Sequence, residues 1–331
     1  MKRSLLLFFL ISYLAGHAQD RGVLQGANAR IFELSDITDT IQFLKLDADT
    51  TVRKPALIVL QGSLPIPLAI EYPSGYHFTS FPFALGKSTE TFHILNISMP
   101  FVPLLARPEE LSANGSLREV PTNYNKANHL QTYVRRTNKV IEFLRKQAWV
   151  EPGEIILFGH SQGGYVALKV AGNNPHISKI GLSACNPFGR FDQYIRRKRM
   201  EEQSGKISSE EAQAQIEEYY EWWRHISDNR HDDNTLQGDT EKAAFSFSEN
   251  FLDDILGLRI PLYITYGTRD IGSLGCDYLP IELERIGKKD YVLKAYPGLG
   301  HNYEEIDERG TSNYDKMFWD EVFQEFIRWA E

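Results

Sequence analysis

The sequence lacks an excess of positive charge. Its 331 residues include 36 lysines and arginines against 44 aspartates and glutamates, a formal net charge of −8 with histidine neutral. A protein whose main partner is nucleic acid presents a basic surface to the phosphates, so we expect no nucleic-acid partner. Hydrophobic residues make up 42% of the chain and charged residues 24%, an ordinary composition for a folded globular protein.

The N-terminus lacks a hydrophobic run long enough to span a membrane. The apolar stretch there, Leu5–Leu14, covers ten residues, whereas a transmembrane helix needs about 20. Lys2 and Arg3 precede this stretch, and Ala18 is a small residue of the kind that signal peptidase reads. We therefore predict that residues 1–18 are a cleaved signal peptide, and that the mature chain is periplasmic or secreted without stable membrane insertion. An uncleaved N-terminal helix is the alternative.

Cysteine is scarce, since only Cys185 and Cys276 occur. Neither lies near the predicted cleavage site, which excludes lipid attachment at a cleaved N-terminal cysteine. An exported chain permits one disulfide between them. The sequence does not give their separation, so a bridge and two buried thiols both stay open.

Internal repeats and low-complexity linkers are absent, and short β-rich runs alternate with helical patterns. This order indicates βαβ units, and we predict an α/β fold with a mostly parallel central sheet flanked by helices over residues 19–331. The expected strands are at 31–34, 40–46, 56–60, 92–98, 155–159, 179–185, 262–267 and 291–298. Helical spacing of apolar residues predicts helices at 123–149, 165–171 and 314–329.

Residues 187–258 break this alternation, because they contain no convincing strand. The charged stretch YIRRKRMEEQ is followed by SSEEAQAQIEEYYEWWRHI, in which Ser208 or Ser209 can cap a helix. We predict a helical insertion over about 187–258. Its aromatic group, Tyr219–Trp223, either packs onto the core or forms an apolar roof over a binding site. The polar residues of His225–Asp233 match no metal-site spacing, so we interpret them as a solvated turn.

The motif GHSQGG occupies Gly159–Gly164, directly after the apolar run EIILF. It fits the pattern G-x-S-x-G between a strand and a helix, where a sharp turn lifts a serine hydroxyl clear of the sheet. The residues two before and two after the serine approach each other closely, so side chains there would clash. Ser161 is therefore the candidate nucleophile; a glycine-rich turn without chemistry is the alternative.

A serine hydroxyl needs a base within hydrogen-bond reach, and the base needs a group that orients it. The strand LYITYG is followed by Asp270, and the strand YVLKAYP is followed by His301. Both residues lie just beyond strand ends, where open α/β sheets place their sites. The order serine, acid, histidine predicts the triad Ser161, Asp270 and His301. Asp277 is a rival acid further along, and His160 is expected to pack or to orient the turn.

With these motifs the chain resembles the α/β-hydrolase family over essentially all of its length after residue 18. GHSQG matches the nucleophile turn of that family, GTRD its acid loop and GLGHN its histidine loop, and the insertion matches the usual position of its lid. Within the family, the short QGS loop is most similar to the dienelactone-hydrolase and acyl-thioesterase-like branch.

The resemblance also implies an oxyanion hole, which is a pair of backbone N–H groups that stabilise the charge of the tetrahedral intermediate. One N–H belongs to the residue after the nucleophile, Gln162, and the other to the loop after the third strand. That loop is LQGSLPIP, so Ser63 is the candidate, with Leu64 close behind. The family often has His-Gly at this loop, where this chain has Gln61 and Gly62.

These residues predict an exported serine hydrolase that cleaves carboxylic esters through an acyl-enzyme, without a metal or organic cofactor. The expected partner is a small-molecule ester or acyl substrate, and the oligomeric state stays open. A serine peptidase of the prolyl-oligopeptidase kind and an acyl thioesterase are alternatives with the same motifs. A binding protein without catalysis on a hydrolase fold is a further alternative.

Overall fold

The computed structural model describes residues 19–331, except residues 25, 38, 80, 81, 86, 234 and 237, and describes only the backbone of residues 235 and 236. The predicted signal peptide, residues 1–18, lies outside the described residues. Within the described residues, no helix is both long enough and apolar enough to cross a membrane.

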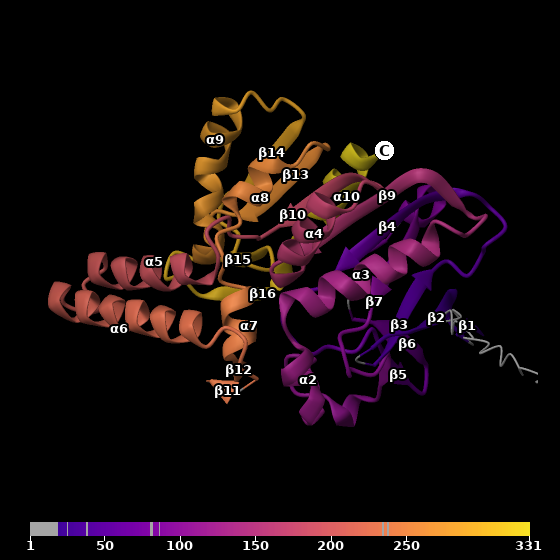
Figure 1. Ribbon diagram of the computed structural model, residues 1–331, viewed down its shortest axis with the longest axis horizontal. Helices are drawn as coiled ribbons and strands as arrows, with labels where there is room; N and C mark the ends of the chain where they lie inside the picture. Colours follow the sequence, from indigo (N-terminus) through magenta and orange to yellow (C-terminus); the bar gives the residue numbers. More distant parts are fainter. Residues whose placement is uncertain are drawn as a thin grey trace, which may run out of the picture.

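A nine-stranded sheet forms the centre of the molecule, in the order β1-β2-β3-β7-β4-β9-β10-β13-β14 (Figure 1). Its strands are β1 (Gln19–Val23), β2 (Ala29–Ser35), β3 (Thr40–Leu46), β4 (Lys54–Leu60), β7 (His93–Ile97), β9 (Val150–His160), β10 (Ile177–Ser183), β13 (Leu262–Gly267) and β14 (Tyr291–Tyr296). The strands from β7 to β14 pair in parallel, and the edge from β1 to β7 is antiparallel. Each predicted strand is present, which confirms the mostly parallel sheet; only the edge strand β1 was not predicted.

Alternate residues of the central strands face two separate cores. On β4, Ala56, Ile58 and Leu60 belong to one cluster of buried residues, whereas Leu57 and Val59 belong to the other. Side chains of a strand alternate between the faces of a sheet, so the two clusters lie on opposite faces. The first cluster includes residues of α3 (Leu130–Leu144), α4 (Gln162–Asn173), α8 (Leu252–Gly257) and α9 (Leu279–Arg285); the second includes α10 (Trp319–Ala330). The predicted α/β layering is therefore confirmed.

Two predicted helices have different bounds in the structure. The segment 123–149 forms α2 (Thr122–Ala127) and α3, because Asn128 and His129 between them leave the helical region of backbone conformation. The predicted closing helix at 314–329 begins only at Trp319, since Tyr314 lies on the strand β16 (Ser312–Met317) with 65% of its surface exposed. A single exposed aromatic residue in phase with the helix extended the apparent periodicity too far.

Small elements that were not predicted complete the fold. They are the strands β5 (Ala69–Tyr72), β6 (Gly75–Phe78), β8 (Leu105–Ala106), β15 (Glu304–Ile306) and β16, the helices α1 (Ser88–Thr91) and α9, and the 3₁₀ turns η1 (Pro108–Glu110) and η2 (Ile271–Tyr278). Such short segments carry too few residues to show a periodic pattern.

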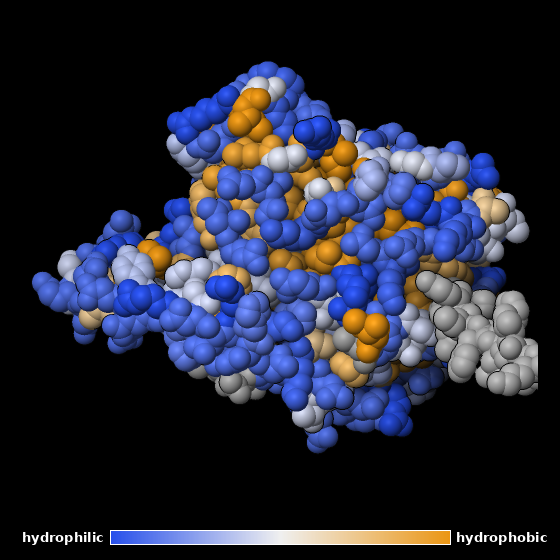
Figure 2. All heavy atoms as spheres, viewed as in Figure 1, coloured by the Kyte–Doolittle hydropathy of each residue, from blue (hydrophilic) through white to orange (hydrophobic). Residues whose placement is uncertain are grey.

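The region between β10 and β13 is helical, as predicted. It contains α5 (Arg190–Gln203), α6 (Ser209–Asp228), α7 (Glu241–Ser246) and α8, with the two-residue strands β11 (Thr235–Leu236) and β12 (Asp239–Thr240), which were not predicted. Helices α5 and α6 form a hairpin that projects from the body (Figure 1), and its outer surface is largely hydrophilic (Figure 2). Ser208, rather than Ser209, caps α6 and forms a capping box with Glu211.

Both cysteines are buried, free thiols. The Cys276 thiol donates a hydrogen bond to the backbone carbonyl of Cys185 across 3.3 Å. Burial raises the pKa of the Cys185 thiol well above its usual range. Of the two alternatives left open by the sequence, the structure has the buried thiols rather than the disulfide.

Candidate active site

Ser161 sits on the sharp turn between β9 and α4. Its φ of 53° and ψ of −121° place it in a region that non-glycine residues rarely adopt. The Ser161 N–H donates to the Ser183 carbonyl (2.8 Å), and the Ser161 carbonyl accepts from the Gly164 N–H (2.9 Å). Neighbouring backbone thus holds the strained turn in place, and the predicted strand–turn–helix context of the motif is present.

The glycines around Ser161 are required by close backbone contacts. A Cβ atom on Gly159 would lie 2.2 Å from the Gly163 carbonyl oxygen, and one on Gly163 would lie 2.2 Å from the Leu60 carbonyl oxygen. Real Cβ atoms do not approach backbone so closely, so neither position accepts a side chain without movement of the turn. This is the physical reason for the G-x-S-x-G spacing.

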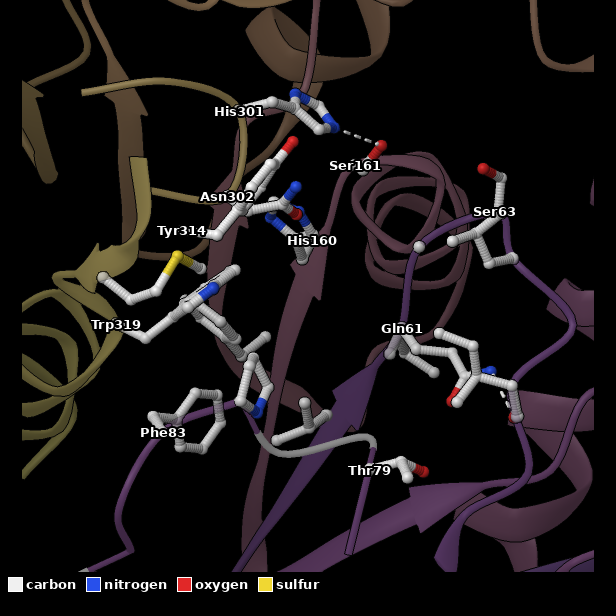
Figure 3. Close-up of a pocket in the computed structure, with 18 residues that line it drawn as sticks. Gln61, Ser63, Thr79, Phe83, His160, Ser161, His301, Asn302, Tyr314 and Trp319 are labelled. Atoms are coloured by element: carbon white, nitrogen blue, oxygen red, sulfur yellow. Dashed lines mark hydrogen bonds between the residues drawn. The ribbon is translucent and has the colours of Figure 1, made fainter. Parts of the chain in front are cut away.

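Ser161, His301 and Asp270 are joined by hydrogen bonds. Nε2 of His301 lies 3.0 Å from Oγ of Ser161 (Figure 3), and Nδ1 of His301 lies 2.7 Å from Oδ2 of Asp270. The three residues follow the carboxyl ends of β9, β14 and β13. The parallel sheet therefore brings together the three residues that the sequence placed at separate strand ends.

Asp270 is buried and receives further donors. Its carboxylate accepts from the Gly272 N–H (2.9 Å) and from the Ser273 hydroxyl. Burial acts to raise the pKa of Asp270, but the hydrogen bond and charge of His301, with these two donors, outweigh it and hold the pKa below its usual range. The rival acid, Asp277, instead accepts a hydrogen bond from the hydroxyl of Tyr266. The geometry thus places Asp270, not Asp277, against the histidine.

The pKa of His301 shifts upward, in the opposite direction to the pKa of Asp270. The surrounding protein disfavours its charged form, but the hydrogen bond and the negative charge of Asp270 outweigh this and raise the pKa of His301 above its ordinary value. Its side chain keeps 40% of its surface exposed, so it stays accessible from the cavities beside it. The arrangement favours a histidine that readily takes a proton from Ser161.

His160 lies beneath Ser161 and His301, with its ring between Ser161 and Trp319 (Figure 3). Its Nδ1 lies 3.0 Å from Oγ of Ser183, and its Nε2 lies 3.3 Å from Oδ1 of Asn302. Burial lowers the pKa of His160 to about 3, so it is neutral near pH 7. Its contacts agree with a packing and orienting position. Neither Ser183 nor Asn302 was predicted from the sequence, in which the adjacency of Asn302 to His301 is the one signal.

The residues predicted for the oxyanion hole lie beside Ser161. Gln162 is the first residue of α4, and the first N–H groups of a helix have no partner within that helix. A Cβ on Gly62 would lie 3.6 Å from Cβ of Ser161, so the loop after β4 passes close to Ser161. Ser63 and His301 lie on either side of Ser161 (Figure 3). The Gln61 side chain donates to the Ile66 carbonyl (3.1 Å) and so braces this loop.

Two cavities meet at Ser161 and His301. One has a volume of about 400 Å³ and a largely apolar lining that includes Leu64, Phe83 and Trp319. The other also measures about 400 Å³, but it lies on the side of the insertion and its lining is largely polar. Ser63 lines both cavities. A bond that reaches Ser161 can therefore have an apolar group on one side and a polar group on the other.

Of the aromatic residues of α6, some pack against other residues of the insertion and one, Trp222, lines a cavity. Trp223 stacks on Phe245, with ring centroids 5.4 Å apart, whereas Tyr220 is 46% exposed. Trp222 stacks on Tyr194 and lines a smaller cavity of about 130 Å³ that shares residues with the polar one. Tyr219 also contacts Tyr194. The group is thus part of the hairpin core and, through Trp222, part of a cavity wall.

The polar residues His225–Asp233 show no metal-ligand cluster, and His225 lies on α6 rather than in the predicted solvated turn. His225 faces Glu241, with 3.7 Å between ring nitrogen and carboxylate. Within the described residues, no three histidine, cysteine, aspartate or glutamate side chains gather as metal ligands would.

The fold is similar to solved structures of several hydrolases, although no family model and no curated protein matches the chain. Acylaminoacyl peptidase from Pyrococcus horikoshii superposes with a TM-score of 0.55 at 15% identity, over 92% of this chain and 42% of the peptidase. Acetyl xylan esterase from Paenibacillus sp. R4 gives 0.53 at 13% identity, over 95% and 88% of the two chains. The α/β hydrolase GrgF from Penicillium sp. sh18 gives 0.50 at 14% identity, over 82% and 91%. At these identities the likeness shows the fold, and it confirms the fold expected from the motifs.

Proposed function

Because the chain has the α/β-hydrolase fold, we propose that it is an exported serine hydrolase that cleaves carboxylic esters. The observation that carries this proposal is the continuous hydrogen-bonded chain from Ser161 through His301 to Asp270, at the junction of two cavities. An isolated serine hydroxyl is a weak nucleophile, and this arrangement supplies the base and the group that orients it. A protein that only binds its ligand has no need of the strained turn at Ser161.

The reaction divides into two halves. Oγ of Ser161 attacks the ester carbonyl carbon while Nε2 of His301 takes the hydroxyl proton. The negative oxygen of the tetrahedral intermediate accepts hydrogen bonds from the N–H groups of Gln162 and Ser63. His301 then returns the proton to the leaving alcohol, which leaves an acyl-enzyme. Water repeats these steps and releases the acid. Asp270 holds the imidazole in the productive tautomer throughout, and no step requires a metal or organic cofactor.

The insertion at about 187–258 forms the lid side of this site. Arg190 and Tyr194, from the first turns of α5, line the polar cavity together with Ser161. The start of α5 therefore restricts which leaving or acyl groups reach the nucleophile. The outer part of the hairpin lies away from the site (Figure 1).

A fluorophosphonate probe tests the proposed nucleophile directly. The mature protein would be treated with the probe and analysed by mass spectrometry, with Ser161→Ala as the control. We expect one adduct on Ser161 and none on the variant. Absence of an adduct on a protein shown to be folded by circular dichroism would contradict the proposal and favour a non-catalytic binding protein.

A separate comparison of substrates tests which type of bond the protein cleaves: ester, amide or thioester. We expect short p-nitrophenyl esters to be hydrolysed faster than aminoacyl-proline amides and acyl thioesters of the same acyl length. A higher kcat/KM for the amides would favour the peptidase alternative, and a higher value for the thioesters would favour the thioesterase. For export, the mass of the protein recovered outside the cytoplasm should correspond to a chain that begins at Gln19.

A further inference from the structure

The polar cavity has a lining suited to a particular kind of ligand. It lies between the nucleophile turn, α2 and the first turns of α5, and its lining beside Ser161 includes Asn128, Arg190, Gln193, Tyr194 and Asp239. Pockets that bind small molecules specifically combine an enclosing wall with a few polar groups that fix the ligand's orientation. Here the polar groups outnumber the apolar ones.

The formal charges in this lining cancel. Arg190 is the only lysine or arginine among the described lining residues, and Nη1 of Arg190 lies 2.8 Å from Oδ2 of Asp239. The other side of its guanidinium donates to Oε1 of Gln162 (2.8 Å) and stacks over the ring of Phe247. Because Asp239 already balances the charge of Arg190, an anionic ligand would add a negative charge that this lining does not balance. A neutral ligand would leave the pair intact.

Neutral hydrogen-bonding groups with unused capacity gather in the same lining. The hydroxyl of Tyr194 and the amide of Gln193 form no hydrogen bond with other described residues, although the Gln193 side chain lies close to Gly272. Asn128 accepts a hydrogen bond from Tyr133 through its oxygen (2.8 Å), which leaves its amide N–H groups unused. Such groups gain most from a ligand that offers both donors and acceptors, as hydroxyl groups do.

Aromatic faces border the cavity on the hairpin side. Tyr194 stacks on Trp222, with centroids 5.7 Å apart at an angle of 21°, and both line the adjoining cavity of about 130 Å³. Arg190 and Asp239 line both cavities, so the smaller one extends the larger. Aromatic rings with a polar edge suit ligands that are apolar on one side and wet on the other.

We propose that the polar cavity binds a neutral polyol, such as a sugar ring, as the alcohol half of an ester whose acyl half is apolar. The inference rests on the proposed ester hydrolysis at Ser161. A polyol is itself an alcohol, so one of its hydroxyl groups supplies the ester oxygen while the others meet the unused groups of Gln193, Tyr194 and Asn128. The apolar cavity bordered by Phe83 and Trp319 then receives the acyl chain.

The test uses esters of one acid that differ only in the alcohol. We would compare ethyl hexanoate with 6-O-hexanoylglucose and 1-hexanoylglycerol, and with the charged esters hexanoylcholine and hexanoylglycolate. We expect kcat/KM for the two polyol esters to exceed that of the ethyl ester by about tenfold, the value of one or two added hydrogen bonds. Tyr194→Phe keeps the stacked ring but removes the hydroxyl, and should reduce this ratio by about 3- to 10-fold.

Tyr220→Phe is the matched control, because Tyr220 lies on the same hairpin but does not line either cavity. It should leave the ratio unchanged. Equal rates for the ethyl and polyol esters, or a preference for either charged ester, would overturn the inference. Faster cleavage of ethyl gluconate than of ethyl hexanoate would overturn the assignment of the polar cavity to the alcohol.

Binding to Ser161→Ala separates this inference from the proposed reaction. Calorimetry would compare 6-O-hexanoylglucose with ethyl hexanoate on this variant, which cannot form an acyl-enzyme. Tighter binding of the glucose ester supports the polyol cavity even if fluorophosphonate fails to label Ser161. Equal binding, with normal labelling of Ser161, would overturn the polyol inference and leave the hydrolase proposal standing.

Discussion

Arg190, at the start of the insertion, donates a hydrogen bond across 2.8 Å to the side chain of Gln162, the residue that follows Ser161. Gln162 is buried and opens α4, so this contact joins the insertion to the turn that carries Ser161. The insertion therefore does more than border the site: its first helical residue braces the segment whose backbone N–H is proposed to hold the oxyanion.

Replacement of Arg190 should lower activity more than it lowers stability. Arg190→Met keeps much of the packing over Phe247 but frees Gln162 and leaves Asp239 unpaired. We expect kcat on p-nitrophenyl acetate to fall about tenfold, the equivalent of one hydrogen bond to a charged group. Arg197→Met, at an exposed position of the same helix, should stay within about twofold of the parent protein. Equal losses in the two variants would contradict the bracing role.

Replacement of the two acids that follow β13, Asp270 and Asp277, should have clearly different effects on kcat. Asp270→Asn removes the carboxylate that orients His301, and we expect kcat to fall by roughly 10³- to 10⁴-fold. Asp277→Asn, seven positions along, removes only the partner of Tyr266 and should leave kcat within about threefold. Steady-state kinetics on one ester decides between them. A larger loss for Asp277→Asn would mean that the wrong acid has been assigned.

The pH dependence of kcat/KM should reflect the raised pKa of His301. The reaction needs a neutral imidazole, so activity falls as the pH drops through the pKa of His301. Because Asp270 raises that pKa, the midpoint of the acid limb of kcat/KM should lie above the ordinary value of about 6.5. In Asp270→Asn the midpoint should move to lower pH. His160, with a pKa of about 3, contributes no limb in this range. Full activity at pH 5 would rule out His301 as the base.

The glycines of α4 should differ sharply in their tolerance of alanine. Gly163→Ala pushes a Cβ into the Leu60 carbonyl, and we expect a loss of about 3 kcal/mol in the free energy of unfolding. Gly172→Ala meets no atom within 4 Å and should stabilise the helix by up to about 1 kcal/mol. Urea denaturation monitored by circular dichroism measures both. A mild effect of Gly163→Ala would show that the turn can relax.

The strand ends and the order of chemistry-bearing residues were readable from the sequence. Buried parallel strands such as β4 are continuous apolar runs, and Ser161 and Asp270 each follow such a run, whereas His301 follows the half-exposed edge strand β14. The ends of the helices near the site were harder to predict from the sequence. Asn128 interrupts a helix whose apolar spacing continues, and Tyr314 extends a helical pattern into a strand, because periodicity reports a buried face and not the backbone path.

By itself the sequence determined the α/β alternation, the strained serine turn and the helical insertion, because these depend on local periodicity and on where glycine is sterically required. Only the tertiary structure decided which acid faces His301, whether the two thiols are bridged, and that Arg190, Gln193 and Tyr194 line one cavity with Ser161. Those relationships join residues far apart in the chain. Their distances are set by the packing of the insertion and the loops over the ends of the parallel strands, which no local pattern encodes.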